Sequence, residues 1–135
     1  HTQVEEVIIS HFHYDHCGSH HLFPKAKFHV QEKEMQYATG PCMCMPALRG
    51  PFTAKDITTM VERVFEDRIV FHNGDAEIAP GVTLHHVGGH TMGLQMVRVC
   101  TRIWNKGDRS RLSITCLICS VGISAPMNSR VHRRM

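Results

Sequence analysis

Residues 10–18 hold the side chains with the clearest chemical potential in this chain. His11, His13, Asp15 and His16 follow the apolar residues 7–9 in the order H-x-H-x-D-H. Alternate side chains of an extended backbone share one face, so His11 and His13 can reach a common point, while Asp15 and His16 can be aimed at a neighbouring one. Imidazole nitrogen and carboxylate oxygen are ligands that zinc and similar divalent ions accept. The spacing therefore predicts two adjacent metal positions.

A less specific interpretation is that these histidines reflect composition alone. The sequence contains 12 His in 135 residues, and a histidine-rich chain brings some of them together by chance. Four potential ligands in this order, directly after an apolar strand, favour a metal site over that alternative.

His90 is the candidate for a further ligand from a distant part of the chain. It follows Gly88 and Gly89, whose missing Cβ atoms allow the backbone to bend sharply and approach a metal pocket. It lies 74 residues after His16, so it must come from a different strand. The alternative is a loop histidine exposed to water. His85 and His86 precede His90 in an alternating strand and are not assigned as ligands, and four other histidines have no comparable context: His20, His21, His29 and His72.

These motifs resemble a known family. The run from His11 to His16 is similar to the signature of the metallo-β-lactamase superfamily, whose members are mostly binuclear metallohydrolases, and residues 87–91 resemble its third-histidine loop. The sequences of residues 20–24 and 89–95 are most similar to those of bacterial N-acyl-homoserine-lactonase-type members, which are quorum-quenching enzymes. The resemblance covers about residues 3–99.

The resemblance implies an α/β fold, the αββα sandwich, of which this chain would build about one half. It implies that His11, His13 and His90 bind one zinc ion and that Asp15 and His16 bind a second, with Asp15 as the catalytic residue that orients the water. A hydroxide that bridges the two metals would attack the carbonyl carbon of a small-molecule lactone and open the ring. One or two zinc ions are expected in this chain.

The family pattern stops near residue 100, so we divide the chain into two parts. Residues 1–99 form an incomplete domain, because the resemblance implies strands before it. Residues 100–135 form a divergent tail. Residues 1–97 carry a net charge of −4 and residues 98–135 one of +7. The family's bridging Asp and last His have no clear counterpart, since Asp108 lies in a basic turn and His132 near the end. We hypothesise that a shifted reading frame produced the tail, which then need not be ordered. Reading the source DNA in all three frames tests this.

Three functions remain open at this stage. The first is the zinc-dependent lactonase, whose activity the missing ligands would lower. The second is the same fold acting on another ester, a thioester, a β-lactam or a persulfide oxidised at iron. The third is a non-catalytic metal-binding fragment.

Composition narrows the partners and the location. No apolar run approaches the ~20 residues that span a bilayer, and no secretory signal is visible, which predicts a cytoplasmic protein without membrane contact. The basic tail lacks a nucleic-acid motif, so we expect no nucleic-acid partner. The six cysteines are interpreted as free thiols, with Cys17 in a packing role.

Hydrophobic periodicity places these motifs on a set of strands and helices. Strands are predicted over residues 3–9, 26–31, 68–71, 82–87 and 92–100, and short helices over residues 15–22, with Asp15 as the cap, and 32–37. Residues 41–51 are predicted to be loop, in which Met43, Met45 and Leu48 either pack or contact an acyl chain. The clearest helix starts at Thr53, and its apolar stripe is predicted to be core: Ile57, Met60, Val61, Val64 and Phe65.

Overall fold

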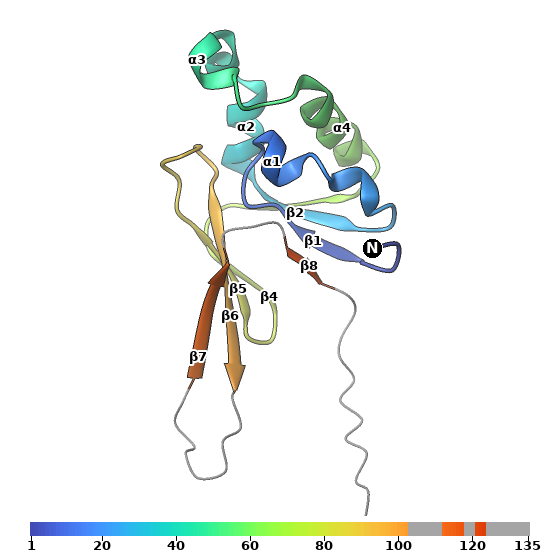
Figure 1. The fold of residues 1–135 in the computed structure, drawn as a ribbon, viewed down its shortest axis with the longest axis vertical. Coiled ribbons are helices and arrows are strands. Elements are labelled where there is room, and N and C mark those ends of the chain that lie inside the picture. Colours follow the sequence, from blue (N-terminus) through green and yellow to red (C-terminus); the bar gives the residue numbers. More distant parts are fainter. Residues whose placement is uncertain (103–111, 118–120, 124–135) are drawn as a thin grey trace, which may run out of the picture.

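The protein is a layered α/β structure built from two four-stranded sheets and a layer of helices (Figure 1). The computed structural model describes the backbone of residues 1–102, 112–117 and 121–123 and the side chains of residues 1–100. Helices α1, α2 and α4 cover one side of the first sheet, and the second sheet lies on the other side (Figure 1). This order of layers is part of the αββα sandwich that the sequence resemblance implies.

The first sheet has the strand order β3-β2-β1-β8. Its strands are β1 (Glu6–Ile8), β2 (Lys27–Gln31), β3 (Ile69–His72) and β8 (Val121–Ile123). Strands β1, β2 and β3 are parallel, and β8 runs antiparallel to β1. Parallel neighbours require long crossover connections, and the helices of this chain provide them.

The second sheet is antiparallel and has the order β4-β5-β6-β7. Its strands are β4 (Ala76–Ala79), β5 (Val82–His86), β6 (Gln95–Arg102) and β7 (Leu112–Leu117). A turn at residues 80–81 joins β4 to β5, and Gly81 takes the positive φ of 78° that this turn requires. The division of the chain near residue 100 remains a prediction, and Asp108 and His132 lie outside the described residues.

Strand alternation divides the buried apolar side chains into two cores. Val7 and Ile9 face the helices together with Phe28, as part of a cluster that also includes Val30 and Met60. Ile8 points the opposite way and packs with Leu84 and Val97 of the second sheet. The first sheet is therefore covered on both faces, and the loop after β1 leaves the sheet between two packed layers.

The helices differ from the sequence prediction over residues 15–22 and 41–51. Asp15 lies inside helix α1 (Tyr14–Cys17) and does not cap it; a separate 3₁₀ turn, η1 (His20–Leu22), follows. Helix α2 (Glu32–Thr39) agrees with the prediction. The predicted loop of residues 41–51 contains two short helices, η2 (Pro41–Cys44) and α3 (Pro46–Arg49), because each proline takes a first helical position, where its missing N–H is not needed.

Helix α4 (Ala54–Phe65) forms where predicted, but its buried face is different. Thr53 occupies the N-cap position without a side-chain capping bond. Ile57 and Met60 are buried as predicted, whereas Phe65 is 87% exposed and Arg63 is 6% exposed. The guanidinium of Arg63 donates through Nη2 to His20 Nδ1 at 2.9 Å and lies 4.7 Å from the centre of the Phe28 ring, while its Nε and Nη1 have no hydrogen-bond partner among the described residues. The apolar stripe therefore ends one turn before the helix does.

Candidate metal centre

The loop that follows β1 brings His11 and His13 to the edge of the first sheet. His11 is 2% exposed and His13 is 7% exposed. His13 is the N-cap residue of α1 and has an extended backbone, so the chain turns into the helix directly after it. Phe12, between the two histidines, is fully buried in the core below. The two imidazoles are thus held on one side by the burial of the residue between them.

His90 reaches the same place from the loop between β5 and β6. Gly88 and Gly89 take positive φ angles of 69° and 89°, a conformation that favours glycine. The N–H groups of Val87 and Gly88 both donate to Leu94 O, which closes this loop at its base. The two glycines therefore allow the turn that carries His90 back over the end of β1.

His11, His13 and His90 form a group with the geometry of a metal site. One nitrogen of each ring lies within 4.8 Å of the others. The ring centre of His90 is 5.0 Å from that of His11 and 4.6 Å from that of His13. Three imidazoles from two distant loops are a common ligand set for zinc.

The electrostatic environment keeps the two buried histidines of this group in the form that binds metals. Burial, together with the neighbouring charges of His16, His13 and His90, lowers the pKa of His11 to about 4. Burial and the charge of His90 also lower the pKa of His13. A neutral imidazole has a free lone pair, whereas an imidazolium has none. At neutral pH these two side chains are therefore ready to act as ligands.

The hydrogen bonds of the His11 ring give independent support for a metal site. His11 Nε2 is buried without a hydrogen-bond partner, which is costly for a polar atom. The other nitrogen of this ring, Nδ1, lies 3.2 Å from Ser10 Oγ. A second hydrogen-bonding partner of this kind commonly orients a metal-binding histidine. A divalent ion among the three rings would satisfy the nitrogen that is left without a partner.

Asp15 and His16 lie beside this group and not within it. The ring centre of His16 is 4.0 Å from that of His11, and its Nε2 is 3.5 Å from Asp15 Oδ2. Ser10 Oγ lies 3.0 Å from His16 Nδ1 as well, so one hydroxyl contacts both rings. An oxygen with two lone pairs can accept from both Nδ1 atoms, and each ring is then in the tautomer whose Nε2 carries no proton. Asp15 and His16 remain the predicted ligands of a second metal position.

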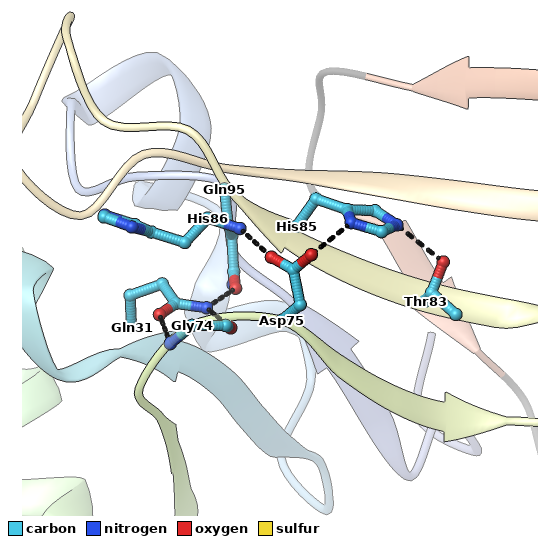
Figure 2. Close-up of polar contacts among 7 residues, drawn as sticks. All are labelled: Gln31, Gly74, Asp75, Thr83, His85, His86 and Gln95. Atoms are coloured by element: carbon cyan, nitrogen blue, oxygen red, sulfur yellow. Dashed lines mark hydrogen bonds and ion pairs between the residues drawn. The ribbon is translucent and has the colours of Figure 1, made fainter.

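The histidines that were not assigned as ligands have other partners. Asp75 accepts hydrogen bonds from His85 Nδ1 at 2.8 Å and from the backbone N–H of His86 at 3.0 Å (Figure 2). The ring of His86 donates to Met92 O at 2.9 Å. His29 lies between Glu6 and His72, at 2.8 Å from each. Among the described residues, none of these joins the three-histidine group.

Two buried polar residues near the site were missed by the sequence analysis. Glu34 of α2 is 1% exposed and accepts hydrogen bonds from the segments of both His11 and His90. Gln95 is fully buried, and its side-chain amide donates to the carbonyls of Ile9 and His29. It also accepts from Gln31, which holds the backbone of Gly74 (Figure 2). A buried glutamate in a helix that otherwise looks polar has no signal in the sequence, because its partners are distant in the chain.

The described cysteines are free thiols, and an aromatic ring borders the site. Cys17 is 1% exposed and its thiol donates to Phe12 O, which confirms the packing role. Cys17, Cys42, Cys44 and Cys100 are all free.

Phe52 packs its ring against His13 at 4.7 Å between centres. Of the three residues predicted to pack or to contact an acyl chain, Met45 is 50% exposed and Leu48 is 37% exposed, whereas Met43 is half-buried. Of the described helices, none is long and apolar enough to cross a membrane.

Several solved structures resemble part of this chain. A probable metal-dependent hydrolase from Staphylococcus aureus superposes with a TM-score of 0.55 at 20% identity, over 70% of this chain and 34% of that one. An N-acyl homoserine lactone hydrolase with N-hexanoyl-L-homoserine at its catalytic metal centre gives a TM-score of 0.47 at 27% identity, over 68% of this chain and 31% of that one. A variant of AiiA from B. thuringiensis with N-decanoyl-L-homoserine at its active site gives the same values.

The chain spans about a third of the length of these solved structures. The sequence profile of the metallo-beta-lactamase superfamily matches residues 2–103. This match includes β1 to β6 and all five predicted ligands. Because it covers well over half of the sequence, the chain belongs to the metallo-β-lactamase superfamily.

Proposed function

We propose that this chain carries the metal centre of a zinc-dependent metallohydrolase that opens a lactone of the N-acyl-homoserine type. The observation that carries the proposal is the convergence of His11, His13 and His90, with a buried nitrogen of His11 that lacks a partner. The preference for a lactone rests on the resemblance of the sequence around His20 and His90 to lactonase-type members. The alternative substrates for the same fold are other esters, thioesters and β-lactams.

The described residues support defined roles in such a reaction. Divalent ions held at this site would supply a water of lowered pKa and polarise the carbonyl of the substrate. His11, His13 and His90 would hold the first ion, and Asp15 and His16 the second. Asp15 has a side chain that is 61% exposed, so it can reach a water molecule at the open side of the site and orient it. The hydroxyl of Ser10 would fix the rings of His11 and His16.

Several apolar side chains of the described residues are exposed and available to an acyl chain. Met45 is 50% exposed, Met92 is 55% exposed and Tyr14 is 60% exposed. Met92 follows His90 by two residues, and Tyr14 lies between His13 and Asp15. Methionine side chains are flexible and adapt to apolar ligands of different lengths. These exposed apolar groups support a substrate with an aliphatic portion over a wholly polar one.

A second candidate is a metal-binding chain without hydrolytic activity. It is favoured by the composition of the three-ligand group, which consists of histidines alone among the described residues. Asp15 is the carboxylate nearest in sequence, and its contact is with His16. A chain that binds one ion firmly and a second only weakly would lack the two-metal arrangement on which the reaction depends.

Zinc content, mutation and substrate assays test the two candidates together. We expect purified, desalted protein to contain between one and two zinc ions per chain by elemental mass spectrometry. His13→Ala should reduce zinc affinity strongly, because it removes one of three ligands, whereas His72→Ala should not. His72 is the matched control, since it is a partly buried histidine outside the group. Equal losses in both variants would show that zinc binds through histidine richness, and would refute the site.

Hydrolysis assays then separate the substrates. N-acyl-homoserine lactones, a thioester and a β-lactam should be offered to the zinc-loaded protein under the same conditions. The lactonase proposal expects turnover of the lactones first. Firm binding of a single zinc ion, without turnover of any of these substrates, would instead support the metal-binding chain.

A further inference from the structure

The metal group depends on a fixed distance between two loops that are far apart in the sequence. His11 and His13 belong to the loop after β1, and His90 belongs to the loop between β5 and β6. Three ligands can share one ion only if their positions are held to within about 0.5 Å. Something in the fold must therefore connect the two loops.

The carboxylate of Glu34 makes this connection. Its Oε1 accepts a hydrogen bond of 2.7 Å from the N–H of Phe12, the residue between His11 and His13. Its Oε2 accepts one of 2.6 Å from the hydroxyl of Thr91, the residue directly after His90. Each oxygen thus holds the backbone or side chain next to a ligand, one from each loop.

A third hydrogen bond strengthens the attachment to the His90 loop. The N–H of Gly93 donates to Oε2 of Glu34 at 3.0 Å. A Cβ on Gly93 would lie 2.5 Å from Glu34 Cα and closer still to the Glu34 backbone nitrogen, so only glycine allows this approach. Hydrogen bonds to a buried carboxylate are stronger and more directional than those between neutral groups.

We propose that Glu34 is a positioning residue of the metal centre, whose carboxylate sets the spacing between the ligand loop of β1 and the His90 loop. This role rests on the proposed metal site and adds a residue to it from the helical layer. Both oxygens are needed, because Phe12 is held by one oxygen and Thr91 and Gly93 by the other. A side chain with a single acceptor oxygen loses the hydrogen bond to the N–H of Phe12 or to that of Gly93, and the hold on that loop is weakened.

Replacement of Glu34 by glutamine tests the role with almost no change of volume. One end of the amide is a donor, so it must face either the N–H of Phe12 or that of Gly93, and one attachment is lost. Zinc affinity, measured by competition with a chelator, should fall by about 10- to 100-fold, the usual range for residues that orient metal ligands. The visible spectrum of the cobalt-substituted protein should change as well, because the ligand geometry changes.

Glu32→Gln is the matched control. Glu32 begins the same helix and is exposed, so the same chemical change there should leave zinc affinity and the cobalt spectrum unaltered. If Glu34→Gln does not fold, Thr91→Val keeps the volume and removes one of the three donors; a several-fold loss of zinc affinity, with Thr91→Ser close to wild type, supports the role.

The results separate this inference from the proposed function. Wild-type protein that binds zinc while Glu34→Gln keeps the same affinity and cobalt spectrum overturns the positioning role alone. Wild-type protein without zinc affinity overturns the metal centre and the positioning role together.

Discussion

The substitution Gly93→Ala should be among the most damaging single-methyl changes in this chain. Gly93 lies against the first turn of α2, where an added Cβ would be 2.5 Å from Glu34 Cα. Carbon atoms in contact prefer about 3.5 Å, so the loop or the helix must move by about 1 Å. The conflict is one of space, since the clashing atoms belong to the backbone of a helix and cannot rotate away.

The magnitude follows from two contributions. Inserting a methylene into a well-packed region costs about 1–3 kcal/mol. Losing the hydrogen bond from Gly93 N–H to the Glu34 carboxylate adds about 1.5–3 kcal/mol, because a charged acceptor is involved. We expect a loss of about 3–5 kcal/mol in the free energy of unfolding of the metal-free protein, a large part of the stability of a domain of this size.

Urea denaturation followed by circular dichroism measures this loss, and Gly50→Ala is the control. Gly50 has helical angles of −50° and −41°, and a Cβ there would meet Pro46 O at an ordinary 3.6 Å. We expect Gly50→Ala to be neutral or slightly stabilising. A Gly93→Ala variant that unfolds within about 0.5 kcal/mol of wild type would refute the close packing between the His90 loop and α2.

Two further predictions concern cysteine reactivity and pH. Burial and the charges of Asp56 and Glu34 raise the pKa of the Cys17 thiol to about 12, so little thiolate forms near neutral pH. Iodoacetamide should therefore modify the exposed Cys44 and leave Cys17 intact, which peptide mass spectrometry measures. Equal rates of modification at the two cysteines would contradict the packing of Cys17. Burial and the charge of His29 lower the pKa of His72 below its ordinary 6.5, so the unfolded chain takes up the proton first and stability falls as the pH drops through that range. Urea denaturation at about pH 7.5 and pH 5.5 should show a larger loss in wild type than in His72→Gln; the same loss in both would exclude His72 as a source of this pH dependence.

The local parts of the site could be predicted from the sequence because their geometry is local. The spacing of His11 and His13 places them on one side of an extended segment, and two glycines before His90 indicate a sharp turn. The first strand was predicted from its apolar run and the strand over residues 26–31 from alternation. In the structure Val7, Ile9, Phe28 and Val30 belong to one core cluster, as the regular geometry of a strand allows. The family resemblance added which of these residues should meet.

Residues whose roles depend on distant partners were missed or misjudged. Phe65 was predicted to be core but is exposed, whereas Arg63, to which the sequence assigned no role, is buried through contacts with His20 and Phe28 that no helical period contains. Burial of a charged side chain needs partners, and these come from other elements. The short helices η2 and α3 were read as loop because their proline positions suit a helix start as well as a turn.

What the sequence by itself determined is the spacing of the candidate ligands and the strands and turns that carry them, because local backbone preferences decide both. Only the tertiary structure decided that His90 meets His11 and His13 and that Glu34 joins their loops. The donors to Glu34 lie 22, 57 and 59 residues away along the chain. Hydrogen bonds over such separations form only after the sheet and helix layers have packed, so no local pattern in the sequence encodes them.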